Sequence, residues 1–217
     1  MSLARFVISR RLCLCGLGAI ALTGSASAAD GPRFRPLCSY SIKDGWSDTG
    51  PQNFITRQAS ANDRSGVPQV VGRIRQALSF TAPFDIYIAE QEDNASARVA
   101  NGRKVLTVDV GFLQKLNAMV GTEWAAIQVI AHEVGHHIAG FGPTSHRSEL
   151  NADYWSGQAL QRLGSAREPA TRTILRVGTE RDTMSHPNKY ARAMTIERGW
   201  DDASQGTIDY SFCLSCR

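Results

Sequence analysis

Hydrophobic and polar positions follow two different periods along the middle of the chain. Over residues 67–80, apolar side chains recur three or four positions apart, which predicts an amphipathic helix. The stretch 84–89 alternates with a period of two and predicts a strand. Asn101-Gly102 joins two further alternating stretches. This dipeptide predicts a hairpin, because both residues tolerate the positive φ of a two-residue turn.

Helical spacing dominates the sequence after residue 111. We expect the helix after Gly121 to have Thr122 as its N-cap and to end before Gly140. The predicted helices cover residues 112–119, 123–137, 147–163, 169–177 and 189–198. Before the first helix, proline and glycine interrupt residues 29–65 at irregular intervals, which predicts a loop-rich arm. A helix, a small antiparallel sheet and then more helices indicate an α+β domain over residues 66–217.

The first 28 residues differ from the rest. Three arginines precede an apolar stretch, 12–22, that is well short of the roughly 20 residues a spanning helix needs. An Ala-Ser-Ala sequence at 26–28 matches a cleavage site. Together these features predict a secretory signal peptide over residues 1–28, with an uncleaved anchor as the competing interpretation. The arginine pair at 10–11 leaves the general secretory and twin-arginine routes open, so we expect a periplasmic or secreted protein.

Composition and charge limit the classes of binding partner that we expect. The chain has 217 residues, 42% of them hydrophobic, enough for one domain with a core. Removing residues 1–28 would remove three arginines and no acid, lowering the formal charge from +4 to +1. No basic stripe with interleaved aromatic residues is present, so we expect no nucleic-acid partner. We also expect no stable membrane span after signal cleavage, and the sequence specifies no oligomeric state.

Three cysteines would remain after cleavage: Cys38, Cys213 and Cys216. An oxidising compartment favours disulfides. We expect Cys38 to pair with Cys213 or Cys216, which would fasten the arm to the C-terminal tail. Pairing of Cys213 with Cys216 is the alternative.

The chemistry is concentrated in the H-E-x-x-H sequence at 132–136. Residues four apart share a face of a helix, so His132 and His136 can bind one metal ion. Glu133 lies beside them, close enough to act as a general base on a water molecule at that ion. This donor set favours Zn²⁺, one ion per chain.

A catalytic zinc ion needs a third protein ligand. The position six residues after His136 is Gly142, so the metzincin pattern is absent. On the next predicted helix, Glu149 is favoured over Asp153 and His146 as the ligand. Asp153, one turn further, can instead accept a hydrogen bond from the outer N–H of a ligating histidine.

These residues resemble a known family. The sequence E-L-N-A-D at 149–153, following H-E-x-x-H, resembles the gluzincin metallopeptidases, and most closely the HtpX and CAAX-prenyl-protease-like family. N-A-S-A at 94–97 resembles the segment on that family's substrate-side strand. His-Pro at 186–187, with Arg192, resembles its late H-P…R motif. The resemblance covers residues 84–200 and implies a zincin-like α+β fold. Those relatives carry spanning helices, whereas we expect none in this chain after its signal peptide, so their membrane substrates are not implied.

The combined expectation is a zinc-dependent metalloendopeptidase with Glu133 as the general base. The resemblance implies an oxyanion stabiliser at His186 or Arg192. A peptide or unfolded protein would bind extended against a sheet edge. The alternative is a zinc-stabilised, non-catalytic peptide-binding or chaperone-like module. A third possibility is a latent peptidase whose N-terminal arm covers the cleft.

Overall fold

A computed structural model describes residues 40–41, 56–90, 92–140 and 146–213. The chain divides into two units, residues 1–32 and 33–217, and every element below belongs to the second. The predicted signal peptide, Cys38, Cys216 and most of the arm lie outside the described residues. None of the helices in the described ranges has the length and apolar character needed to cross a lipid bilayer.

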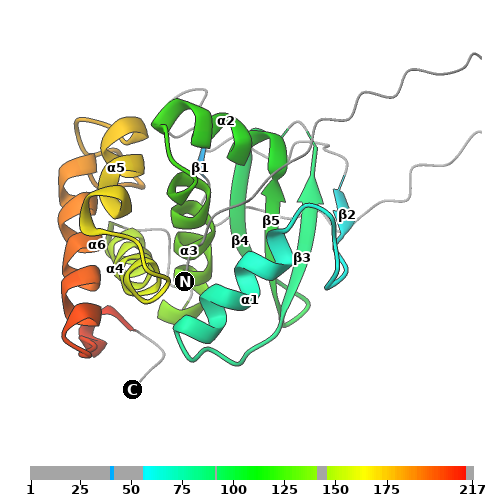
Figure 1. Cartoon of the computed structure of the whole chain (residues 1–217), viewed down its shortest axis with the longest axis horizontal. Helices are drawn as coiled ribbons and strands as arrows, with labels where there is room; N and C mark the ends of the chain where they lie inside the picture. Colours follow the sequence, from blue (N-terminus) through cyan, green and yellow to red (C-terminus); the bar gives the residue numbers. More distant parts are fainter. Residues whose placement is uncertain (1–39, 42–55, 91, 141–145, 214–217) are drawn as a thin grey trace, which may run out of the picture. The chain divides into compact units, whose positions relative to one another are not determined.

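Five strands form one mixed sheet, in the order β1-β4-β5-β3-β2 (Figure 1). The strands are β1 (Tyr40–Ser41), β2 (Thr56–Gln58), β3 (Phe84–Ala89), β4 (Asn94–Ala100) and β5 (Arg103–Asp109). β3 and β5 run parallel, whereas the other pairs are antiparallel. The expectation of an antiparallel sheet is therefore wrong in this respect. The chain runs from β3 to β4, which lies two positions away in the sheet. The hairpin then places β5 between β4 and β3.

The hairpin itself is confirmed. β4 and β5 pair from Ala95↔Val108 to Ala100↔Arg103. The two residues between them have the positive φ angles of a tight hairpin turn, 50° at Asn101 and 74° at Gly102.

Six α-helices lie in the described part of the chain. They are α1 (Val67–Ala77), α2 (Val110–Val120), α3 (Trp124–Ala139), α4 (His146–Arg162), α5 (Arg167–Val177) and α6 (Lys189–Ser204), followed by the 3-10 helix η1 (Tyr210–Phe212). Each predicted helix is present, with changed ends. α2 begins early because the Asp109 carboxylate accepts a hydrogen bond from the Phe112 N–H. The N-cap of α3 is Glu123, not Thr122, although the Thr122 hydroxyl accepts a hydrogen bond from the Trp124 N–H.

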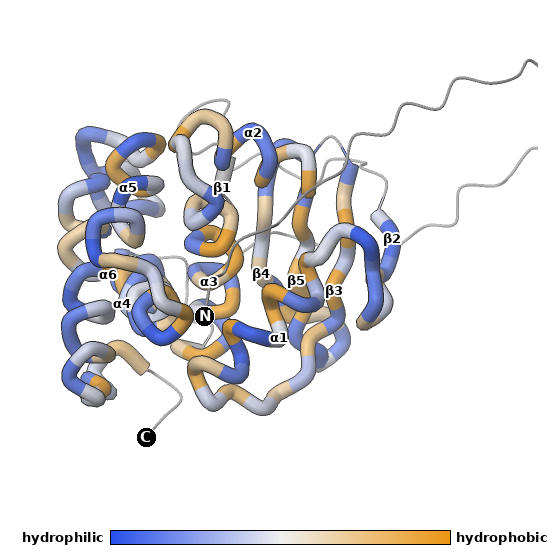
Figure 2. Tube along the Cα trace, in the orientation of Figure 1, coloured by the Kyte–Doolittle hydropathy of each residue, from blue (hydrophilic) through white to orange (hydrophobic). Residues whose placement is uncertain are grey.

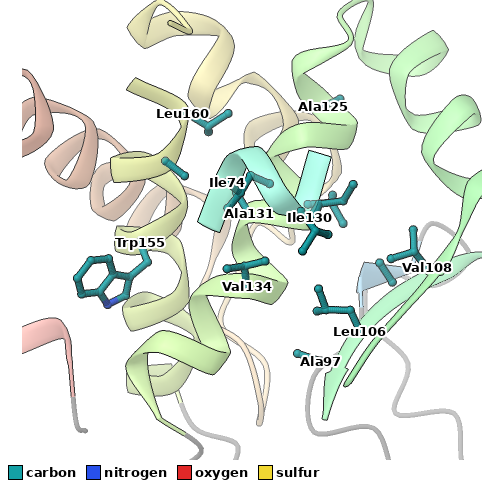
Figure 3. Packing of buried hydrophobic residues seen from close by; sticks show 14 of the residues in the cluster. Ile74, Ala97, Leu106, Val108, Ala125, Ile130, Ala131, Val134, Trp155 and Leu160 are labelled. Atoms are coloured by element: carbon teal, nitrogen blue, oxygen red, sulfur yellow. The ribbon is translucent and has the colours of Figure 1, made fainter. Parts of the chain in front are cut away.

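α3 is the central element of the fold. It packs against β4 and β5 on one side and against α4 on another. Figure 3 shows Leu106 and Val108 of the sheet on one side of α3 and Leu160 of α4 on the other. Hydrophobic residues are concentrated in α3 and the neighbouring strands, whereas α5 and α6 are mainly hydrophilic (Figure 2). Burial on several sides explains why polar residues of α3 lie in the interior.

Glycines set the close approach of three helices. A Cβ added at Gly135 of α3 would lie 2.6 Å from the carbonyl oxygen of Ala152 on α4. At Gly157 of α4 and Gly199 of α6, an added Cβ would lie 2.0 Å from a carbonyl oxygen of the facing helix. α4 therefore packs at backbone distance against both α3 and α6. α6 continues past Gly199 to Ser204, beyond the predicted end at residue 198.

The C-terminal tail is fastened to the helices. Cys213 is disulfide-bonded, as two of the three pairings considered above require, and its partner lies outside the described residues. Its Sγ lies 3.5 Å from the carbonyl oxygen of Ile138 at the end of α3. The indole N–H of Trp155 donates to the Phe212 carbonyl oxygen at 3.1 Å. These contacts hold the tail against α3 and α4.

Candidate metal centre

Three donor side chains converge between α3 and α4. His132 and His136 lie one turn apart on α3, and Glu149 lies in the first turn of α4. The two Nε2 atoms are 3.1 Å apart, and the Glu149 carboxylate oxygens lie 3.4 Å from His132 Nε2 and 3.6 Å from His136 Nε2. Ligands around a tetrahedral zinc ion are about 3.3 to 3.5 Å apart. The spacing therefore fits one four-coordinate ion with three protein ligands.

The carboxylate of this cluster is buried and makes no hydrogen bond within the described residues. His132 and Glu149 are fully buried, and His136 is nearly so. Neither Glu149 carboxylate oxygen has a hydrogen-bond partner among the described residues. An unsatisfied buried carboxylate is costly, and a cation between the three donors would compensate it. Within the described ranges, this is the one group of three such residues placed to hold a metal ion.

The charges of the donors respond to burial and to one another. Burial raises the pKa of Glu149, but the adjacent His136 and His132 lower it below its ordinary value overall. Burial lowers the pKa of His136 to about 4, which keeps the imidazole neutral. A carboxylate and a neutral imidazole are the forms that bind a metal ion.

A buried ion pair holds the His132 ring. The Asp153 carboxylate lies 2.8 Å from His132 Nδ1, and Arg192 of α6 donates to the same carboxylate from Nε at 2.7 Å and from Nη2 at 2.8 Å. Burial lowers the pKa of His132, but Asp153 raises it to about 9 overall. Because Nδ1–H faces Asp153, Nε2 is left to face the donor cluster.

Glu133 lies beside the cluster and has no structural partner. It is fully buried, and neither carboxylate oxygen has a hydrogen-bond partner among the described residues. Burial raises its pKa to about 8. His132 and the backbone N–H of Ala97 on β4 lower the pKa in part, although that N–H forms no regular hydrogen bond. No regular hydrogen bond within the described residues thus compensates the burial of this carboxylate.

Of the late motif, His186 approaches the cluster. It precedes α6, is 6% exposed, and its Nε2 lies 3.6 Å from a Glu149 carboxylate oxygen. Its Nδ1 lies 2.7 Å from the Ser185 hydroxyl, and burial lowers its pKa to about 4. Arg192, by contrast, directs its guanidinium to Asp153, and its Nη2 lies 3.7 Å from Glu149. Both residues of this motif therefore lie at a similar distance from the Glu149 carboxylate, and Arg192 alone is also paired with Asp153.

The two remaining histidines near the motif point elsewhere. His137 Nε2 lies 3.1 Å from the carbonyl oxygen of Val105, and its ring meets Phe84 edge-on. His146 Nε2 lies 2.7 Å from the Thr183 carbonyl oxygen. His146 thereby connects the start of α4 to the loop that carries His186.

Sequence reasoning missed the importance of Gly135. This glycine is one of the variable positions of H-E-x-x-H, and its contact with Ala152 brings the two helices together. The sequence has a small residue inside each motif, Gly135 in H-E-x-x-H and Ala152 in E-L-N-A-D. Whether these two residues meet depends on how the helices pack.

Comparison with family models, curated proteins and solved structures gave no match to this chain. The function of this chain is therefore inferred from the geometry of the site.

Proposed function

We propose that the chain is a zinc-dependent metalloendopeptidase with a zincin-like fold. The observation that carries this proposal is the placement of Glu133. It is a buried carboxylate without a structural partner, next to a triangle of two imidazoles and a carboxylate. A purely structural metal site has no use for such a group.

The residues divide into separate roles. His132, His136 and Glu149 would hold the zinc ion, which supplies Lewis-acid chemistry toward a peptide carbonyl and toward water. Glu133 would accept the proton of the attacking water and pass it to the leaving amine. Asp153 and Arg192 would orient His132.

We assign stabilisation of the developing oxyanion to His186 rather than to Arg192. Both side chains lie close to Glu149, but the Arg192 guanidinium is already engaged by two hydrogen bonds to Asp153. A donor for the oxyanion must lie beside the reacting carbonyl. We also propose export by the N-terminal signal and a peptide or unfolded protein as substrate.

The test compares the chain from Ala29 with its Glu133→Gln variant. Zinc per chain is measured in both, and cleavage of reduced casein is followed with and without a chelator. We expect about one zinc per chain in each protein, with cleavage in the unaltered chain alone and none after chelation. Equal cleavage by the variant would refute the role of Glu133, and absence of zinc would refute the metal site.

One observation favours the alternative, a zinc-stabilised, non-catalytic peptide-binding or chaperone-like module. His132, Glu133 and Glu149 have no exposed surface, and His136 is 4% exposed, as in a closed structural site. Bound zinc without cleavage in either protein, together with peptide binding, would support this alternative.

A further inference from the structure

β1 occupies the outer edge of β4. The two strands pair antiparallel, with Tyr40 opposite Ala95 and Ser41 opposite Asn94. The other edge of β4 is filled by β5. In the sheet order β1-β4-β5-β3-β2, β1 is therefore the outermost strand on the side of β4 (Figure 1).

This edge leads directly to Glu133. α3 packs on β4, so Glu133 of α3 lies close to the backbone of Ala97 on β4. Ala95 and Ala97 are two residues apart, so their backbone N–H and C=O groups face the same edge, about 7 Å apart along the strand. β1 pairs with Ala95, two residues before Ala97, so it lies on β4 beside the position where an extended peptide would place a carbonyl near Glu133.

Burial along β4 agrees with an occupied edge. Residues 94–98 are all buried, whereas Val99, just beyond them, is 45% exposed. Glu133 is fully buried as well. A general base must come within hydrogen-bond distance of the water that it activates, and a substrate must reach that water. The described arrangement is consequently a closed one.

We propose that β1 is an intramolecular occupant of the substrate-binding edge and keeps the enzyme latent until an extended peptide displaces it. This inference rests on the proposed peptidase function and identifies its regulation. A pairing of two residues supplies few hydrogen bonds, each of small net strength, so a peptide of several residues can compete with it. The apparent affinity for that peptide equals its intrinsic affinity multiplied by the fraction of chains in which the edge is free.

The test removes the amide donors of β1. In the double variant Tyr40→Pro/Ser41→Pro, proline cannot donate to a strand partner but keeps an extended backbone. The matched control is Thr56→Pro/Arg57→Pro in β2, on the opposite edge of the sheet. Zinc content and thermal unfolding of the chains from Ala29 show whether each variant is folded. A fluorescence-quenched peptide gives KM and kcat.

We expect KM to fall about five- to fiftyfold in the β1 variant and to stay unchanged in the β2 variant. Ser41→Pro alone should lower KM in the same direction by a smaller factor, and it serves if the double variant fails to fold. Unchanged or raised KM in a folded β1 variant would overturn the inference.

A binding measurement separates this inference from the peptidase proposal. Anisotropy of a labelled peptide is measured on Glu133→Gln with and without the β1 substitutions, which requires no cleavage. Tighter binding after the β1 substitutions supports the occupied edge even if no chain cleaves, and the peptidase proposal alone then fails. Equal binding overturns the occupied edge even if cleavage is established.

Discussion

At the scale of single residues, the orientation of His132 depends on charges buried behind it. Asp153 and Arg192 are buried, and their pairing leaves the Asp153 carboxylate facing the Nδ1 atom of His132. Burial of two charges has a desolvation cost, and removal of one partner leaves the other charge buried and uncompensated. This pair therefore fixes which imidazole nitrogen of His132 faces the donor cluster.

The substitution Asp153→Asn keeps a side chain of the same size but removes the negative charge between His132 and Arg192. We expect zinc affinity to fall about 10- to 100-fold, because the histidine ring loses the group that orients it and makes it a better donor. Competition with a zinc-binding dye measures the affinity. Wild-type affinity in this variant would show that the Asp153 carboxylate has no role in zinc binding.

A second residue-scale prediction concerns Glu92, next to β4. Burial raises its pKa to about 7, against 4.5 for an exposed glutamate, although Arg98 offsets part of this effect. The folded chain therefore binds this proton more tightly than the unfolded chain. The stability contributed by Glu92 is complete below pH 4.5 and is lost as the pH rises through 7.

The variant Glu92→Gln should remove this dependence. As the pH rises from 4.5 to 8, the free energy of unfolding of the variant should increase by about 1–3 kcal/mol relative to that of the unaltered chain. Urea unfolding at the two pH values measures the difference. Parallel pH profiles for the two proteins would contradict the prediction.

At the scale of elements, the candidate site depends on the crossing of α3 and α4. The helices approach closely because Gly135 has no side chain where it meets Ala152. The donors of α3 lie on either side of this contact in sequence, and Glu149 lies one turn before Ala152 on α4. The separation of the two backbones therefore controls the distance from the histidines to Glu149.

Replacing Gly135 by alanine should force the helices apart. We expect a loss of about 1–3 kcal/mol in the free energy of unfolding, together with weaker zinc binding. The matched control is Gly72→Ala in α1, where an added Cβ meets nothing within 4 Å and better helix propensity should raise stability slightly. Urea unfolding and zinc titration test both variants. Equal behaviour of the two would show that the crossing tolerates a methyl group.

At the scale of the whole molecule, a metal ion would join two helices that contact different parts of the domain. α3 packs on the sheet, and α4 packs on α3 and on α6. The donors come from both α3 and α4. An ion that binds the folded chain and not the unfolded chain stabilises the folded state by mass action.

Zinc should therefore raise the unfolding temperature of the purified chain. With free zinc at about 100 times Kd, the stabilisation is about 2.7 kcal/mol, which corresponds to an increase of about 5–10 °C for a chain of this size. Glu133→Gln should keep this increase, since Glu133 is not a proposed ligand, whereas His132→Ala should lose it. Differential scanning fluorimetry with and without a chelator measures the shift, and an identical shift in all three proteins would exclude this site.

The sequence by itself determined the features that depend on local geometry. Asn101-Gly102 specified the hairpin turn through its φ preferences. Four-residue spacing placed His132 and His136 on one face of α3, and the same spacing placed Glu149 and Asp153 on one face of α4. These inferences needed the period of a helix or a turn and no distant contact.

The tertiary structure alone decided the relations between distant segments. It set β5 parallel to β3, directed Arg192 to Asp153, and placed β1 on the edge of β4. Each depends on which surfaces meet, and local preferences along the chain carry no information about that choice. A buried arginine pairs with the carboxylate that packing brings near it, and a strand adds to the edge that remains open.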